Sequence, residues 1–309
     1  MQNFTKAPHL EKLIIQANKL APINVAVVDA TEKHVLAGAH EACQTGLIKP
    51  ILIGEKQRIT DICTELGLNT KLENVTIVQA ESETEAAQIG VDLVLAGKAQ
   101  ALMKGWIHTD VLMHPVLKHL RTARRISHVF VADLATYHKL LFITDAAINI
   151  APDLITKAAI VQNAIDLAQV LGVKTPKVAA LSAVELVKPA ISSTCEAACL
   201  SKMAQRGQIR GAIVDGPLAF DNAISKEAAQ TKQITSEVSG DVDILLAPDL
   251  NAGNILAKDL EYLAHTTLAG IVIGAKVPIM LTSRSDPSAA RIASAAICSL
   301  ALQQWKKFL

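Results

Sequence analysis

Apolar runs alternate with amphipathic stretches along almost the whole chain. Short runs rich in β-branched residues predict strands at residues 24–30, 48–54, 74–80 and 101–105. Apolar positions spaced by three or four residues then predict the intervening helices, for example at residues 83–96. Regular alternation of strands and helices is typical of a parallel, doubly wound sheet.

The alternation breaks at residues 121–127. Two strand candidates, residues 127–134 and 139–144, follow one another with only a short link, which predicts a hairpin. The pattern then resumes, with strands at residues 177–182, 211–215, 243–248, 269–274 and 277–282 and helices at residues 153–171, 194–206 and 287–306. Because 309 residues are too many for one compact core, we expect two α/β domains with a boundary near Ser127.

Composition narrows the class of protein. The 30 basic residues balance the 29 acidic ones and aromatic residues are few, so we expect no nucleic-acid partner. The most apolar stretch, residues 268–282, contains Lys276 and Pro278, and the N-terminus has no signal-peptide core, so we expect no membrane segment. Five cysteines without a CxxC pair indicate reduced thiols, no metal site and a cytoplasmic protein.

Polar residues at strand ends are informative, because open α/β sheets bind ligands where strands end and helices begin. Lys104 and Gly105 stand at the end of the strand candidate at residues 101–105. Lys104 can hold a phosphate there, or it can be a surface lysine whose aliphatic stem packs on the protein. Thr109 or Asp110 is a candidate cap of the next helix.

Two further strand ends carry the same kind of residue. Asp215 and Gly216 follow a strand candidate, where Asp215 can position a substrate or stabilise the turn. Asn251, Gly253 and Asn254 open a helix in which small residues let a ligand approach the backbone. Asn251 can be the helix cap, whereas Asn254 lies one turn further in, where Asn is a poor helix former.

The fourth strand end is followed by a Ser-Arg pair, Ser283 and Arg284. Asp286 and Pro287 then predict a helix cap followed by proline at the first helical position. An arginine beside a helix N-terminus suits a phosphate. The chain has no GxGxxG fingerprint, P-loop, GxSxG or HExxH motif, so a nucleophile supplied by the substrate, such as a thiol, is the natural expectation.

Four motifs at these positions occur in a fixed order: ITDAAIN at residues 143–149, DGPL at 215–218, PDLNAGN at 248–254 and TSR at 282–284. They resemble the phosphate acetyltransferase/phosphate butyryltransferase family. Residues 104–105, 124–129 and 215–225 are most similar to the phosphate acyltransferase portion of proteins described as bifunctional enoyl-CoA hydratase/phosphate acetyltransferase. No residues correspond to the hydratase portion, so no hydratase activity is expected.

The resemblance implies two α/β domains of the isocitrate/isopropylmalate dehydrogenase type with the active site in the cleft between them. Residues 1–126 and 284–309 would form one domain, and residues 127–283 a second domain that dimerises. The implied partners are acyl-CoA, phosphate and acyl phosphate, bound by a homodimer without a metal or a cofactor other than coenzyme A as substrate. The implied reaction is reversible transfer of a short acyl group (acetyl, propionyl or butyryl) between coenzyme A and inorganic phosphate.

The resemblance also implies roles for individual residues. The coenzyme A thiol attacks the acyl phosphate carbonyl, while Ser283 hydrogen-bonds the developing charge and Arg284 binds the phosphoryl oxygens. The residues of the shared motifs expected to bind substrate are Lys104, Gly105, Thr109, Asn149, Asp215, Gly216, Asn251, Gly253 and Asn254.

The sequence departs from the family at two positions. Family acetyltransferases carry a catalytic aspartate seven residues after the serine, where this chain has Ala290, so Asp286 is the nearest candidate for the base. They also carry an arginine where this chain has His114, and Arg124 or Arg125 can take its place in binding substrate.

Two alternatives follow from the same residues. A same-fold NAD(P)-dependent hydroxy acid dehydrogenase would need a metal site, for which Asp215 and Asp249 are the candidates. A catalytically weakened protein that binds acyl phosphate or coenzyme A would account for the departures at Ala290 and His114.

Overall fold

The structure is a computed structural model that describes residues 7–68, 75–284 and 286–309. The chain divides into two compact units: unit 1 comprises Met1–Arg124 and Ala269–Leu309, and unit 2 comprises Arg125–Leu268. The sequence suggested the boundaries 126/127 and 283/284, whereas residues 269–283 belong to unit 1. The reason is strand pairing, because the strand at Ile279–Met280 joins the sheet of unit 1.

The sheet of unit 1 has the strand order β3-β2-β1-β4-β11-β10. Neighbouring strands are parallel except β10 and β11, which are antiparallel. The strands are β1 (Ile23–Val28), β2 (Ile48–Gly54), β3 (Thr76–Gln79), β4 (Ala101–Lys104), β10 (Thr267–Ile273), whose first two residues belong to unit 2, and β11 (Ile279–Met280). The helices are α1 (Pro8–Ala17), α2 (Lys33–Gln44), α3 (Lys56–Glu65), α4 (Glu83–Leu95), α5 (Thr109–His119) and α11 (Ser288–Leu302), followed by the 3₁₀ helix Trp305–Phe308.

The sheet of unit 2 has the strand order β5-β6-β9-β7-β8. Its strands are β5 (Ser127–Asp133), β6 (Leu141–Thr144), β7 (Lys177–Leu181), β8 (Ile213–Leu218) and β9 (Ile244–Leu246). Its helices are α6 (Leu154–Val170), α7 (Ser192–Gln205), α8 (Phe220–Ile224), α9 (Lys226–Thr231) and α10 (Leu250–Tyr262). β5 and β6 pair antiparallel, which confirms the predicted hairpin, and the other neighbours are parallel.

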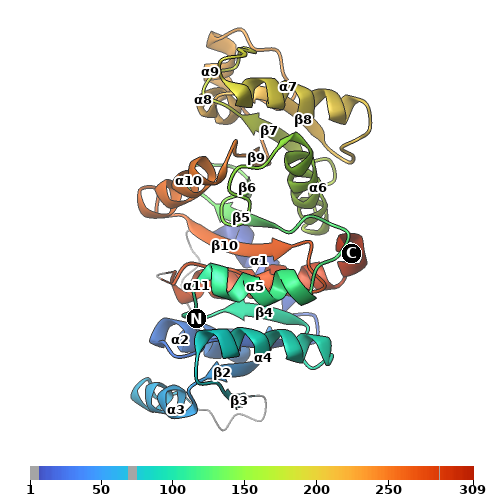
Figure 1. Cartoon of the computed structure of the whole chain (residues 1–309). Helices are drawn as coiled ribbons and strands as arrows, with labels where there is room; N and C mark the ends of the chain where they lie inside the picture. Colours follow the sequence, from blue (N-terminus) through green and yellow to red (C-terminus); the bar gives the residue numbers. More distant parts are fainter. Residues whose placement is uncertain (1–6, 69–74, 285) are drawn as a thin grey trace. The chain divides into compact units, whose positions relative to one another are not determined.

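Burial on both faces explains why continuous apolar runs form these strands. Every residue of β4 and of β5 is buried, and in β1 only Asn24 is partly exposed. In unit 1, α4 and α5 pack against each other, and α11 packs against both α1 and α2 (Figure 1). The many alanines of α11 are buried, because small side chains allow this close packing.

The predicted elements agree with the structure except at some ends. The strand expected at residues 277–282 is only Ile279–Met280, and the helix expected at residues 287–306 ends at Leu302. Residue 74, the first of the strand expected at residues 74–80, lies outside the described residues, as do residues 1–6 of the N-terminal segment. In the part of the chain that is described, no helix has the length and apolar character needed to cross a membrane.

Candidate active site

The strand ends of unit 1 bring two of the predicted segments together. β4 and β11 are parallel neighbours, with Met103 opposite Met280, so the residues that follow both strands reach the same edge of the sheet. Lys104 ends β4, and Thr282, Ser283 and Arg284 follow β11. The structure therefore gathers Lys104, Ser283 and Arg284 at the carboxyl edge, where α/β sheets bind ligands.

Gly105 allows the chain to leave β4 directly against β1. The Gly105 backbone N–H donates to the Val28 carbonyl oxygen at 2.9 Å, and the Trp106 N–H donates to the Asp29 carbonyl oxygen at 2.8 Å. A Cβ atom at Gly105 would lie 2.1 Å from the Asp29 oxygen and 2.4 Å from the Val28 oxygen. Only glycine fits here, because both obstructing atoms belong to the backbone of the neighbouring strand end.

We expect Gly105→Ala to lower the free energy of unfolding by about 3 kcal/mol, since the added methyl group must displace two backbone carbonyls. Urea unfolding followed by tryptophan fluorescence measures this change. Gly97→Ala is the matched control: it meets no atom within 4 Å but has a φ of +69°. It should cost about 1 kcal/mol, and equal losses for the two variants would contradict the close approach at Gly105.

Arg284 lies over the segment that follows β4. Its guanidinium carbon is 5.2 Å from the centre of the Trp106 ring, a cation–π distance. One guanidinium nitrogen is 3.2 Å from Nδ1 of His108, whose backbone N–H in turn donates to Glu83 Oε2 at 3.2 Å. These contacts hold the arginine at the edge of the sheet beside Lys104.

Asp286 does not cap the last helix, so that prediction is wrong. The residue before α11 is Pro287, and no side-chain hydrogen bond caps the helix. Asp286 Oδ2 instead accepts the backbone N–H of Ser283 at 2.7 Å, while the Asp286 N–H donates to the Ser283 carbonyl oxygen at 3.2 Å. The carboxylate, which is 2% exposed, therefore closes the turn that carries Ser283 and Arg284.

Arg291 is a central residue of this site that the sequence analysis did not identify. It lies in α11 and is 1% exposed. Its guanidinium donates to the Lys104 carbonyl oxygen at 3.3 Å, the Thr282 hydroxyl at 3.0 Å and the Ser283 carbonyl oxygen at 3.2 Å. Gly38 of α2 makes room for the side chain, because a Cβ there would lie 2.6 Å from Arg291 Cδ. Its only signal in the sequence is one arginine within the alanine-rich run AARIASAA.

Lys104 is buried, so the alternative of a surface lysine is wrong. Its side chain is 4% exposed. Burial lowers the pKa of Lys104 from its usual range to about 8, and the positive charges of Arg284 and Arg291 act in the same direction. Asp286 and Glu83 oppose this shift with smaller effects. An ammonium group in this setting is easily deprotonated near neutral pH.

In unit 2, Asp145 and Asn149 of the ITDAAIN motif organise a loop. Asp145 Oδ1 accepts the backbone N–H groups of Ala147 at 2.9 Å and Ile148 at 3.0 Å. The Asn149 amide donates to the Ile126 carbonyl oxygen at 3.0 Å and accepts from Arg125 Nε at 2.8 Å. Arg125 and Asn149, predicted separately, therefore lie together, and Asp145 is the residue of this loop that the sequence analysis left out.

The start of α10 supports the same loop. A Cβ on Gly253 would lie 2.5 Å from the Asp145 carbonyl oxygen, and the Asn254 amide donates to the Ala146 carbonyl oxygen at 3.1 Å. Asp249, rather than Asn251, caps α10 by accepting the Ala252 N–H at 3.0 Å. Asn254 thus has a structural partner, and Asn251 is an exposed residue of the first helical turn.

The remaining predicted residues are more dispersed. Thr109 is the first residue of α5 and does not cap it, because the capping position is His108. Arg124 stacks on Phe308, with 5.8 Å between the guanidinium carbon and the ring centre. Asp215 Oδ1 accepts the Gly216 N–H at 2.8 Å, which fits the turn-stabilising role. Asp249 Oδ1 likewise accepts a backbone N–H, that of Ala252 at 3.0 Å.

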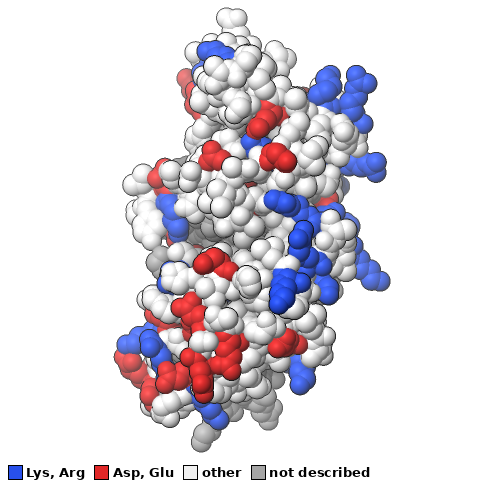
Figure 2. Space-filling view, viewed as in Figure 1, with Lys and Arg blue, Asp and Glu red and all other residues white. Residues whose placement is uncertain are grey.

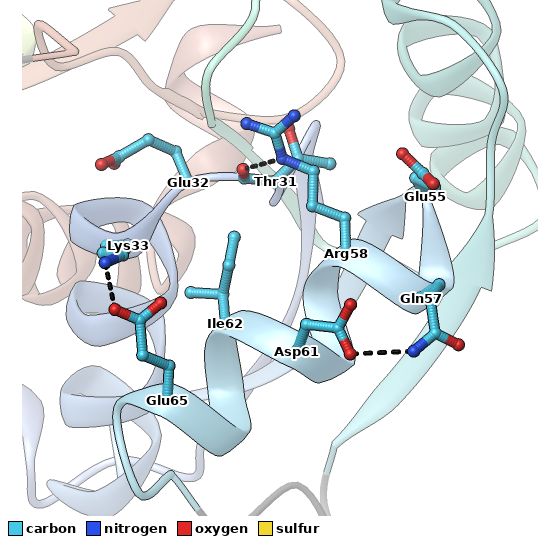
Figure 3. Close-up of a pocket in the computed structure, with 9 residues that line it drawn as sticks. All are labelled: Thr31, Glu32, Lys33, Glu55, Gln57, Arg58, Asp61, Ile62 and Glu65. Atoms are coloured by element: carbon cyan, nitrogen blue, oxygen red, sulfur yellow. Dashed lines mark hydrogen bonds and ion pairs between the residues drawn. The ribbon is translucent and has the colours of Figure 1, made fainter.

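A separate hollow of about 470 Å³ lies in unit 1 where β1 and β2 end (Figure 3). Four carboxylates (Glu32, Glu55, Asp61 and Glu65) and two cations (Lys33 and Arg58) line it. Lys33 pairs with Glu65, and Arg58 donates to the Thr31 carbonyl oxygen at 2.9 Å. Figure 2 shows acidic side chains gathered over this part of unit 1. The excess of negative charge makes this hollow unfavourable for a phosphate. Lys104 and Arg284 are therefore the better candidates for binding an anion.

Comparison with known proteins identifies the family. A family profile described as "Phosphate acetyl/butaryl transferase" matches residues 81–299. The chain belongs to this family. A phosphate acetyltransferase from Rickettsia typhi is 51% identical over 304 residues, covering 97% of this chain and 86% of the relative. A phosphate butyryltransferase from Clostridium acetobutylicum is 38% identical over 292 residues, covering 94% of this chain and 96% of the relative.

A solved structure agrees with this assignment. The branched-chain phosphotransacylase from Enterococcus faecalis superposes with a TM-score of 0.76 at 31% identity, covering 91% of this chain and 99% of the other. The expected family, the α/β fold and the acyltransferase class are therefore confirmed. The roles of the individual site residues stay predictions that rest on the geometry described above.

Proposed function

We propose that this protein transfers a short acyl group between coenzyme A and inorganic phosphate, in either direction. The observation that carries the proposal is the pair of cationic side chains, Lys104 and Arg284, at one sheet edge beside Ser283. Arg284 binds the phosphoryl oxygens, and Ser283 hydrogen-bonds the charge that develops on the acyl oxygen. Groups that bind this charge more strongly in the transition state than in the substrate accelerate the reaction.

The reaction proceeds through one bound complex of both substrates. Positive charge from Arg284 and Lys104 stabilises phosphate as it leaves or attacks, and coenzyme A supplies the sulfur nucleophile. The substrates and these side chains together provide every group that the transfer needs, so the protein uses no metal or organic cofactor. Arg125 and Asn149, with Asp145, form a second polar cluster in unit 2 that we assign to substrate binding.

Purified protein should release free thiol from acetyl-, propionyl- or butyryl-CoA only when phosphate is present. A colorimetric thiol assay with each acyl-CoA, with phosphate or with sulfate as the control anion, measures this directly. Phosphate-independent hydrolysis, or no release from any of the three, would contradict the proposed function. The ratio of the three kcat/KM values also reports the acyl chain length, since each methylene is worth about 1–3 kcal/mol.

We further propose a cytoplasmic homodimer that dimerises through unit 2. All five cysteines carry free thiols, as is usual in a reducing compartment. Exposed apolar residues of unit 2, such as Ile150, Leu186 and Val187, suit a subunit interface. Light scattering coupled to size exclusion measures the mass, and Leu186→Asp should shift it toward the monomer if this surface forms the interface.

A further inference from the structure

The proposed transfer moves a proton as well as an acyl group. Coenzyme A attacks as the thiolate, whereas its free thiol is largely protonated at neutral pH. A group at the site must therefore take the thiol proton in one direction and return it in the other. Of the two positions suggested by the sequence, one has no acidic group and the other is engaged in a turn. Ala290 has no acidic group, and Asp286 Oδ2 accepts the Ser283 N–H inside a closed turn.

Lys104 is a buried basic group at this edge of the sheet. Its side chain is 4% exposed, yet its ammonium forms no hydrogen bond or ion pair with any residue that the structure describes. Its backbone carbonyl oxygen accepts from Arg291, which fixes the main chain at the strand end. A buried amine without a carboxylate partner is unfavourable as a permanent cation.

Four charged groups act on Lys104. The positive charges are Arg284, in the turn after β11, and Arg291, in α11. The negative charges are Asp286, in the same turn, and Glu83, in α4. Burial and the two arginines hold the pKa of Lys104 at about 8, against the smaller opposing effects of the two carboxylates. Both protonation states are therefore available near neutral pH.

We infer that Lys104 is the residue that exchanges a proton with the sulfur of coenzyme A, an inference that rests on the proposed function. When acyl phosphate is consumed, the neutral Lys104 Nζ takes the thiol proton and becomes an ammonium. The sulfur lone pair forms the S–C bond to the carbonyl carbon, and the C–O bond to phosphate breaks with its electrons on the departing phosphate. When acyl-CoA is consumed, the ammonium returns the proton to the departing thiolate.

This role goes beyond binding an anion. A lysine that only holds phosphate gains from being charged at all times, and a carboxylate partner or an exposed position would secure that state. Burial and the charges of Arg284 and Arg291 do the opposite, because both arginines destabilise a third positive charge. Arg284 remains charged and holds the phosphoryl group while Lys104 changes its protonation state.

The test compares Lys104→Arg with the wild type in the direction that consumes acyl-CoA. Neither acyl-CoA nor inorganic phosphate titrates between about pH 7.5 and 10, so the enzyme sets the profile there. Wild-type kcat should fall as the pH rises through about 8, where Lys104 loses its proton. Lys104→Arg keeps the positive charge but does not release a proton in this range, so kcat should be about 10²-fold lower and should show no such fall.

Lys98→Arg, at an exposed position, is the matched control and should behave as the wild type. Thermal unfolding establishes whether the guanidinium is accommodated at position 104. Because Lys104→Arg places a larger side chain at a buried position, Lys104→Ala provides a second test in the direction that consumes free coenzyme A. Added primary amines of different pKa should restore its rate at fixed pH in proportion to the concentration of free amine.

Each outcome decides between proton transfer and anion binding. A folded Lys104→Arg variant with the wild-type rate and pH profile overturns the inference. Two results with a folded Lys104→Ala variant also overturn it: no rescue by added amines, or a rescued rate that follows the ammonium concentration instead of the free amine. These results leave the proposed function intact, provided that the wild type releases thiol with phosphate. Wild-type protein without phosphate-dependent release would overturn the proposed function itself.

Discussion

Replacing Arg284 by Gln is expected to lower kcat/KM for acyl-CoA and phosphate by about 10³-fold, or about 4 kcal/mol of transition-state stabilisation. Glutamine keeps a planar polar group but removes the positive charge that the phosphoryl oxygens require. The guanidinium is positioned by Trp106 at 5.2 Å and by His108 at 3.2 Å, so little entropy is lost when phosphate binds. Steady-state kinetics with both substrates varied measures the effect.

Arg58→Gln is the matched control for this prediction. Arg58 lies in the same unit and near the same edge, but it lines the acidic hollow of Figure 3 and donates to the Thr31 carbonyl oxygen. Its substitution should leave the kinetics close to those of the wild type. If Arg58→Gln proved the more damaging variant, phosphate would bind in the hollow and the assignment of Arg284 would be wrong.

Replacing Arg291 by Met is expected to lower the free energy of unfolding by about 3–5 kcal/mol. The loss follows from three buried acceptors that would be left without their donor: the Lys104 carbonyl, the Thr282 hydroxyl and the Ser283 carbonyl. Burial already lowers the pKa of Arg291, with Asp286 opposing that shift, so removing the arginine also takes a positive charge away from this buried carboxylate. Urea denaturation followed by tryptophan fluorescence and circular dichroism measures the change.

Arg121→Met is the control for the arginine-to-methionine change, because Arg121 is an exposed residue of the same unit. It should alter stability by less than about 0.5 kcal/mol. The two units can unfold separately, so both probes should be compared before a single free energy is assigned. A loss for Arg291→Met no larger than that of Arg121→Met would show that the three hydrogen bonds contribute little.

Arg284→Gln and Arg291→Met together separate substrate binding from positioning of the loop. Arg284→Gln should remove activity and leave stability nearly unchanged, since its side chain is only partly buried. Arg291→Met should mainly lower the free energy of unfolding. Its effect on activity should be indirect, because the turn that carries Ser283 is displaced. This contrast distinguishes a side chain that contacts substrate from one that shapes the loop carrying it.

The sequence was informative where local patterns have one structural solution. The apolar run 127–134 became β5 because both faces of this strand are buried, and the run 48–54 became β2, in which only Lys49 is exposed. The short link between residues 134 and 139 predicted the antiparallel pair β5–β6 for the same local reason. Lys104, Ser283 and Arg284 could be selected as site residues because each follows a strand candidate, and parallel strands share one carboxyl edge.

Local patterns failed where two structures fit the same residues. Asp286 before Pro287 predicted a helix cap, yet its carboxylate accepts the Ser283 N–H, because an aspartate can bond either to the following helix or to the preceding turn. Asn251 was a candidate cap for α10, but Asp249, two residues earlier, takes the position. The choice depends on where the backbone leaves the sheet, which a few residues of sequence do not specify.

The sequence by itself determined the alternation of strands and helices, the family motifs and the placing of a lysine, a serine and an arginine at strand ends. Only the tertiary structure decided that Arg291 reaches Lys104, Thr282 and Ser283, and that Lys104 is buried with no ion pair among the residues that the structure describes. The physical reason is the distance along the chain between the residues that interact. Periodicity and capping depend on neighbours within a few residues, whereas burial and charge depend on contacts between residues 104, 284 and 291, which only the folded sheet brings together.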